Sequence, residues 1–452
     1  MRLPDRPPFV LRARVLTPLA GGGTADHVDG ILSVGADGRI DWVGPFGRWQ
    51  ALAGAVDGAP EPIDLRPHVV LPGMVDLHAH LPQLPNAGLG YGLDLLTWLD
   101  RYIFPMERRF DSAAGAESLA PAAFRAFAAA GTTTLLAYGA VYKASMDGAF
   151  RAAETHGIRA ILGKVMMDRI TYDETIDRST ILERSVRESA ELIEQWHGAD
   201  GGRLGYAVTP RFAISCSAEL LRESAALAAR TGAWWQTHVS EDPGEIAEVA
   251  RLFPEAGDYV DVYDQAGGLG ARTVLAHAVH LNDRELARLV ETDTRVAHCP
   301  ASNLFLASGI MPLARFREAG LKVGLGSDVA GGPDPSIFEV MQVGAYSQAS
   351  LRTMSGETRP ILQPLDWLRA GTLDGAVALG LEDVIGSIEV GKDADLIAID
   401  PRVTAPRRDL PYEAERVTPD EVMSRLIFRA HQDMVRGAWV RGRRLEGPAA
   451  TT

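Results

Sequence analysis

The chain has 452 residues, of which 46% are hydrophobic and 23% are charged, as in a soluble globular protein. Its formal net charge is −14 and no Lys- or Arg-rich block occurs, which disfavours nucleic acid or an anionic membrane as a partner. We expect no membrane span, because no charge-free apolar run reaches roughly 18 residues, and no signal peptide. The two cysteines, Cys216 and Cys299, exclude a disulfide framework and favour a cytoplasmic location.

Strand-like sequence occupies both ends of the chain. Short apolar segments there alternate with turn residues such as Gly and Asp. The expected strands are Phe9–Val15, Gly30–Val34, Ile40–Val43, Gly386–Lys392, Ala394–Ile399, Met434–Val440 and Arg441–Leu445. The simplest arrangement pairs residues 1–72 with residues 386–452 in one small β-sandwich domain.

Between these ends, short apolar runs alternate with longer helical patterns such as Ala116–Ala130 and Ala218–Arg230. The runs are Gly73–His80, Thr132–Tyr138, Ala160–Met166, Leu204–Phe212, Ala233–Val239, Thr273–His277, Arg295–His298 and Leu321–Asp328. This alternation predicts a closed parallel (β/α)8 barrel of the TIM type over residues 73–385. A doubly wound open sheet is the alternative, and it is disfavoured because no Gly-x-Gly-x-x-Gly turn follows a strand.

The segment Asp76–His80 ends the first expected barrel strand and is the most informative part of the sequence. Side chains alternate along a strand, so His78 and His80 leave the same face about 7 Å apart. Two imidazoles placed in this way can bind one divalent metal ion. The pair alone does not decide between a metal site and two packed or solvated histidines.

Polar residues also end the later barrel strands. They are His238 and Glu241 after strand five, His277 after strand six, His298 after strand seven and Asp328 after strand eight. In a barrel of this type, the carboxyl ends of the strands surround one catalytic mouth. We therefore expect these residues to lie near His78 and His80, although they are far apart in the sequence.

Three histidines and one aspartate, with one coordination position of the metal left for water or substrate, are typical of a catalytic Zn²⁺ site. The predicted ligands are His78, His80, His238 and Asp328. Such a metal lowers the pKa of a bound water toward about 7, and Glu241 is placed to shuttle protons. His298 is the weakest member of the set and is expected behind the ligands.

Several motifs resemble the amidohydrolase superfamily of metal-dependent barrel hydrolases. They are Pro72–His80, Thr237–Glu241, Ala276–His277, Ala297–Pro300, Gly326–Asp328 and Gly386–Leu396. Strand five carries a single histidine with a glutamate three residues later, and no bridging carboxylated lysine is evident. This combination resembles the mononuclear deaminase branch of the superfamily.

Within that branch, the sequence resembles the guanine deaminase family over nearly its whole length. The resembling segments are His78–Gln83, Asp94–Leu99, Tyr102–Phe110, Thr209–Phe212 and Ser327–Gly332. The departures are Thr237 before the strand-five histidine and Ser327 before the strand-eight aspartate. The resemblance implies one Zn²⁺ per subunit, with Fe²⁺ as the alternative, a purine as substrate, and a homodimer.

The chemistry of guanine suits three residues in these segments. Arg211 presents a planar fork of donors for the carbonyl and N7 edge of the purine. Gln83 offers both a donor and an acceptor for a mixed edge. Phe212 can pack on the purine face or line the wall of the site. We expect His238, Glu241 and Asp328 to contact the substrate as well.

These residues suggest a hydrolytic mechanism that yields xanthine and ammonia. In this hypothesis Asp328 is the general base, Glu241 donates a proton to ring nitrogen N3, and His277 orients the reacting oxygen. One alternative is a hydrolase of the same fold acting on another aminated or halogenated heterocycle, such as an oxidised purine, a pterin or a triazine. A non-catalytic binding protein on a degenerate barrel is disfavoured because neither a metal ligand nor Glu241 is missing.

Overall fold

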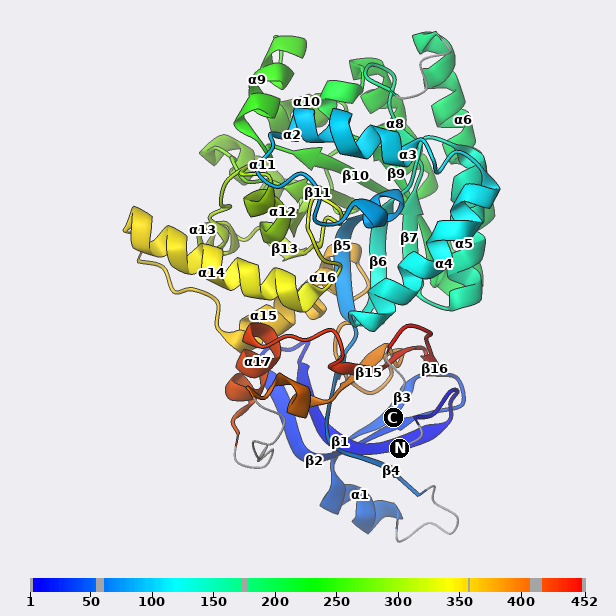
Figure 1. The fold of residues 1–452 in the computed structure, drawn as a ribbon, viewed down its shortest axis with the longest axis vertical. Helices are drawn as coiled ribbons and strands as arrows, with labels where there is room; N and C mark the ends of the chain where they lie inside the picture. The colour runs from blue at the N-terminus through cyan, green and yellow to red at the C-terminus, as the bar shows by residue number, and fades with distance from the viewer. Residues whose placement is uncertain (1–2, 54–60, 172–176, 357, 407–416, 449–452) are drawn as a thin grey trace.

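The computed structural model describes residues 3–53, 61–171, 177–356, 358–406 and 417–448. Within these residues the strands form two sheets. One is a parallel barrel, drawn in the upper part of Figure 1, and the other combines strands from both ends of the chain below it. The barrel and the second sheet confirm the fold class expected from the sequence, while the domain boundaries stay a prediction.

The barrel strands of the described residues run in the order β5-β6-β7-β9-β10-β11-β12-β13, with each neighbouring pair parallel. Their bounds are β5 Met74–His80, β6 Thr132–Tyr138, β7 Arg159–Gly163, β9 Leu204–Pro210, β10 Trp234–Val239, β11 Thr273–His277, β12 Arg295–His298 and β13 Lys322–Leu325. The expected third strand is divided, because β8 (Val165–Met166) follows β7 after Lys164 and pairs with β9. All eight predicted strands are therefore present; β6, β11 and β12 have the predicted boundaries, and those of the others are shifted by a few residues.

The first and last barrel strands meet through residues at and just beyond their carboxyl ends. The backbone N–H of Asp328 donates to the carbonyl of His78 at 2.7 Å, and the N–H of His80 donates to the carbonyl of Val329 at 2.9 Å. These two hydrogen bonds lie along the seam of the barrel, between β5 and the segment that follows β13.

Most of the helices surround the barrel, whereas α1 lies against the second sheet (Figure 1). The helical segments are α1 Phe46–Ala53, η1 Leu81–Asn86, α2 Leu95–Trp98, η2 Leu99–Ile103, α3 Phe104–Glu107, α4 Ala113–Ala129, α5 Lys143–His156, α6 Arg178–Trp196, α7 Ala199–Gly202, η3 Ala213–Ser215, α8 Ala218–Thr231, α9 Pro243–Leu252, α10 Tyr259–Gln265, α11 Asp283–Glu291, α12 Pro300–Phe305, α13 Leu313–Glu318, α14 Ile337–Ser355, α15 Pro364–Ala370, α16 Leu373–Leu379, η4 Pro401–Thr404 and α17 Pro419–Phe428. None of these helices is both long and apolar enough to cross a membrane.

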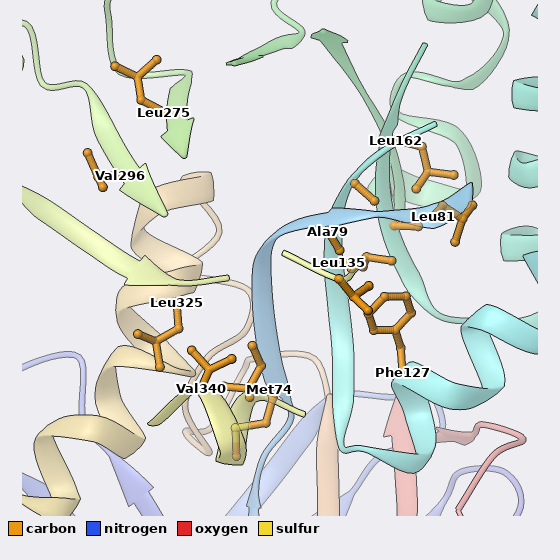
Figure 2. Close-up of a cluster of buried hydrophobic side chains, with 14 of the residues drawn as sticks. Met74, Ala79, Leu81, Phe127, Leu135, Leu162, Leu275, Val296, Leu325 and Val340 are labelled. Atoms are coloured by element: carbon orange, nitrogen blue, oxygen red, sulfur yellow. The ribbon is translucent and has the colours of Figure 1, made fainter. Parts of the chain in front are cut away.

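Helix α4 shows why the outer helices form and where they pack. Ser112 caps its first turn by accepting a hydrogen bond from the backbone N–H of Gly115, a preferred arrangement at a helix start. Ala116, Ala120 and Phe127 are buried on one face at helical spacing. That face packs on the barrel, where Phe127 lies beside Leu135 of β6 (Figure 2).

The second sheet has the strand order β16-β15-β14-β4-β1-β2-β3 among the described residues. Its strands are β1 Phe9–Pro18, β2 Thr24–Val34, β3 Ile40–Pro45, β4 Ile63–Pro72, β14 Leu396–Ile399, β15 Val435–Val440 and β16 Arg443–Arg444. Residues of β1, β2, β4, β14 and β15 contribute to one buried cluster that includes Leu11, Leu32, Val70, Leu396 and Trp439. Because one face of so many strands encloses a single core, the sheet must curve around that core.

One expected strand is wrong. Gly386–Lys392 forms turns and bends instead of a strand. Gly386 and Gly391 have positive φ angles of 88° and 94°, which break an extended conformation. The ammonium of Lys392 then donates to the hydroxyl of Ser387 at 2.6 Å, which closes the turn on itself.

A buried ion cluster joins the barrel to the second sheet. The guanidinium of Arg159 in β7 donates to Asp395 at 2.9 Å and to Asp393 at 2.8 Å, just before β14. We expect Arg159→Ala to lower the free energy of unfolding by about 3–5 kcal/mol, because it leaves two buried carboxylates without this cation. Urea denaturation measures the change, with the exposed Arg187→Ala as control. A loss no larger than that of the control would contradict the prediction.

Candidate active site

Four side chains predicted as metal ligands come together at the carboxyl end of the barrel. The ligating atoms of His78, His80, His238 and Asp328 all lie within 4.8 Å of one another. Asp328 Oδ1 is 3.0 Å from His78 Nε2 and 3.2 Å from His80 Nε2. His238 Nε2 is 3.2 Å from His80 Nε2, a separation suited to two ligands of one ion.

The donor atoms of this cluster fit a divalent metal. His238 Nδ1 lies 2.6 Å from the carbonyl of Arg211, so Nδ1 carries the proton and the lone pair of Nε2 faces the cluster. Burial lowers the pKa of His80 to about 4, which keeps this imidazole in the neutral form that binds metals. His78 Nε2 is buried and its neighbour at 3.0 Å is Asp328 Oδ1, as expected for two atoms that bind one ion.

Glu241 and His277 lie beside the cluster. His277 Nε2 is 3.3 Å from Glu241 Oε2 and 3.8 Å from Asp328 Oδ2. The other ring nitrogen, Nδ1, donates to Asn303 Oδ1 at 2.9 Å, so the ring is held with Nε2 toward the two carboxyl groups. The sequence analysis assigned no role to Asn303.

The environment of Glu241 favours its protonated form. Burial, reinforced by the negative charge of Asp328, raises the pKa of Glu241 well above its usual value. The hydroxyl of Ser308 lies 3.4 Å from Glu241 Oε1. A buried carboxyl group whose pKa is raised in this way holds its proton more readily and is suited to donate it to a substrate.

The backbone at the strand ends is strained where it presents these groups. His277 and Asp328 have positive φ angles of 73° and 48°, which are uncommon for residues other than glycine. Asp76 fixes the chain before Asp328, because its carboxylate accepts from the hydroxyl of Ser327 at 2.5 Å and from the N–H of Ser327 at 3.0 Å. Asp76 belongs to the Asp76–His80 segment, but no role for it was predicted from the sequence.

Gln83 and Arg211 face the same cavity as the cluster, together with the predicted contact residue Phe212. The cavity is lined by His80, Gln83, Leu95, Trp98, Leu99, Arg211, Phe212, His238, Glu241, His277, Leu306 and Asp328. A polar end with titratable groups and an apolar wall is the usual composition of a small-molecule site. The apolar wall formed by Leu95, Trp98, Leu99 and Leu306 was not assigned from the sequence.

His298 is not one of the residues that form the ligand group. It is buried, and neither ring nitrogen has a hydrogen-bond partner among the described residues. Burial, with a smaller contribution from His277, lowers the pKa of His298 to about 3. Its imidazole is therefore neutral, and the structure shows no contact that assigns it a task.

Glu107 is the main residue near the site that the sequence analysis missed. Its carboxylate accepts from Gln83 Nε2 at 2.7 Å and from Arg211 Nη1 at 2.6 Å. A signal was present in the sequence, since Glu107 falls between the buried Ile103 and Phe110 at helical spacing of four and three. An acidic residue on an apolar face needs a buried partner.

Comparison with known proteins identifies the family. The amidohydrolase family profile matches residues 69–445. The chain is 39% identical to a probable guanine deaminase of Deinococcus radiodurans, over 92% of each chain. It is 36% identical to the guanine deaminase of Escherichia coli, over 90% of each chain.

A solved structure supports the same assignment. The guanine deaminase of C. acetobutylicum with guanine bound in its active site matches with a TM-score of 0.86 and 28% identity, covering 97% of this chain and 99% of that one. Family profile, curated relatives and fold therefore agree over most of the length of the chain. The chain belongs to the amidohydrolase family and, within it, to the guanine deaminases.

Proposed function

We propose that this chain catalyses the hydrolytic deamination of guanine to xanthine and ammonia in purine catabolism. The observation that carries the proposal is the shared cavity. Three of the four candidate metal ligands line one cavity together with Glu241 and the polar pair Gln83 and Arg211. Groups that activate water thus face groups that recognise the polar edge of a flat heterocycle.

The chain's own residues supply the proton transfers. Asp328 takes a proton from the attacking water, and Glu241 delivers its proton to ring nitrogen N3 as the oxygen adds to C2. His277, held by Asn303, orients that oxygen. Asp328 then passes its proton to the amine, which leaves as ammonia, while Glu241 takes the hydroxyl proton at C2 as the carbonyl of xanthine forms. The buried position of Glu241, 2% exposed, keeps bulk water from bypassing it as proton donor.

Arg211 and Gln83 support guanine over other heterocycles. A buried guanidinium donates to carbonyl oxygens and ring nitrogens but cannot accept from an amino group. An oxopurine such as guanine offers such acceptors at O6 and N7. Phe212 and the apolar wall provide surfaces for the purine ring.

The test of this function is ammonia release by the purified, zinc-loaded protein with guanine as sole substrate. Release with a stoichiometric yield of xanthine supports the proposal. A folded, metal-bound sample that releases no ammonia from guanine overturns it. Oxidised purines, pterins and triazines are then the substrates to examine on the same site.

We propose Zn²⁺ as the metal, held by His78, His80, His238 and Asp328, with Fe²⁺ as the alternative. Three nitrogen donors and one oxygen donor suit a borderline metal of this kind. When bound, the metal polarises a water and lowers its pKa toward about 7.

Removal of the metal is expected to abolish deamination. Dialysis against a chelator should reduce ammonia release from guanine to background, because no side chain of the site replaces the metal in activating water. Adding back Zn²⁺ should restore the rate, and adding Mg²⁺ should not, since Mg²⁺ prefers oxygen ligands. Full activity at less than about one metal in a hundred subunits, measured by elemental analysis, would contradict this expectation.

A cytoplasmic homodimer is also proposed. The dimer is supported by the family resemblance. The cytoplasmic location is supported by Cys216 and Cys299, which are both buried and unpaired.

A further inference from the structure

Glu107 is buried beside the proposed site but does not line the cavity. Its side chain is fully enclosed, with 0% of its surface exposed. It ends the short helix α3, which follows η1 and η2 along the chain. A buried carboxylate is costly unless charged or polar partners satisfy it, so its partners indicate its purpose.

The two partners of Glu107 are Gln83 and Arg211, the two polar residues proposed to recognise the purine edge. One carboxylate oxygen accepts from Gln83 Nε2 at 2.7 Å, and the other accepts from Arg211 Nη1 at 2.6 Å. These partners come from different parts of the fold, because Gln83 belongs to η1 and Arg211 follows β9. A single carboxylate therefore fixes the distance between two recognition groups that are far apart in the sequence.

The contact with Glu107 also decides which way the Gln83 amide faces. A carboxylate only accepts, so the nitrogen of the amide must face Glu107. The amide oxygen then lies 3.4 Å from the backbone N–H of Ala330, two residues after Asp328. The donor and acceptor ends of Gln83 are thus set before a substrate arrives.

Arg211 is held by the same helix in two ways. Its guanidinium pairs with Glu107, and its Cζ lies 5.3 Å from the ring centroid of Phe104 at the start of α3. Both Arg211 and Glu107 are almost completely buried, so their interaction is little screened by solvent. This arrangement keeps the guanidinium in one orientation, which a bidentate recognition group requires.

We propose that Glu107 is a positioning residue for substrate recognition, acting through Gln83 and Arg211 to select a purine with a carbonyl at C6. This inference rests on the proposed function, since it concerns how the same site distinguishes guanine from related purines. Glu107 itself touches neither the substrate nor the metal ligands. Its effect is to fix the positions of Gln83 and Arg211, whose donors contact the polar edge of the purine ring.

The test compares two substrates that share the reacting amine and differ at C6. Guanine carries the carbonyl, and 2-aminopurine lacks it. In Glu107→Gln we expect kcat/KM for guanine to fall about 100-fold, mainly through KM, while kcat/KM for 2-aminopurine changes less than about 5-fold. Glu117→Gln, an exposed glutamate of α4, is the matched control and should leave both values unchanged.

A purely structural role for Glu107 predicts a different result. Loss of packing or stability would lower kcat/KM for both substrates by the same factor, and that outcome overturns the proposal. If Glu107→Gln does not fold, Glu107→Asp serves instead, because its shorter side chain cannot keep both hydrogen bonds. We expect the guanine to 2-aminopurine ratio to fall about 10-fold in that variant, and an unchanged ratio overturns the proposal.

A binding measurement separates this inference from the proposed reaction. If the wild-type protein does not deaminate guanine, the proposed reaction fails, and calorimetry still reports on Glu107. Hypoxanthine, which has the carbonyl at C6 but no amine, should bind the wild type more tightly than unsubstituted purine does. Glu107→Gln should remove that preference, and a preference that persists in the folded variant overturns the inference.

Discussion

Replacing Glu241 with glutamine is expected to lower kcat for guanine by about 10²–10⁴-fold, the usual contribution of a positioned general acid or base. Glutamine has nearly the same shape but cannot release a proton to the purine ring. The metal ligands are unchanged, so the variant should bind metal as the wild type does. Steady-state ammonia release and elemental analysis on the same sample measure both properties.

The pH dependence gives an independent check on Glu241. Because Glu241 must carry its proton to donate it, kcat/KM of the wild type should fall as pH rises through its raised pKa. Glu255→Gln, an exposed position, is the matched control and should keep the wild-type rate and profile. A Glu241→Gln enzyme with a near-normal rate would remove Glu241 from the proton pathway.

Asp328→Asn should reduce kcat/KM for guanine by at least about 10³-fold, because it removes a metal ligand and the general base together. Asp328 Oδ1 lies between His78 Nε2 and His80 Nε2, and an amide in its place carries no negative charge. Metal affinity should fall as well. Competition with a chelating dye measures the affinity, and the deaminase assay measures the rate.

Two comparisons make the Asp328 result decisive. Asp383→Asn changes an exposed aspartate in the same way and should alter neither metal affinity nor rate. Saturating Zn²⁺ should restore metal to Asp328→Asn without restoring its rate. Recovery of full activity by metal alone would mean that Asp328 serves only as a ligand and that another group is the base.

The strands of the barrel could be predicted from the sequence because they are buried on both faces. Such strands are continuous apolar runs, and Thr132–Tyr138, Thr273–His277 and Arg295–His298 have the predicted boundaries. The segment Gly386–Lys392 instead alternates Ile388 and Val390 with polar residues, as an edge strand can, yet positive φ angles at its glycines turn the chain. Hydrophobic pattern alone does not report backbone conformation at glycine.

The site could be predicted only in part, for a related reason. Histidines at strand ends are recognisable, since the barrel brings every strand end to one mouth. Glu107 ends a short helix that directly follows η2, and its partners Gln83 and Arg211 are 24 and 104 residues away in the sequence. No local pattern records such a contact, so only the three-dimensional structure reveals that one carboxylate joins both recognition groups.

The seam between β5 and β13 has a consequence for the integrity of the protein. His78, His80 and Asp328 contribute their side chains to the proposed metal site and their backbone groups to the hydrogen bonds that join the first and last strands. A metal ion held by these side chains therefore also fastens the two ends of the barrel together. Without bound metal, the contact between β5 and the segment after β13 loses this stabilisation. The metal-free protein should therefore be cleaved by proteases faster than the metal-bound one.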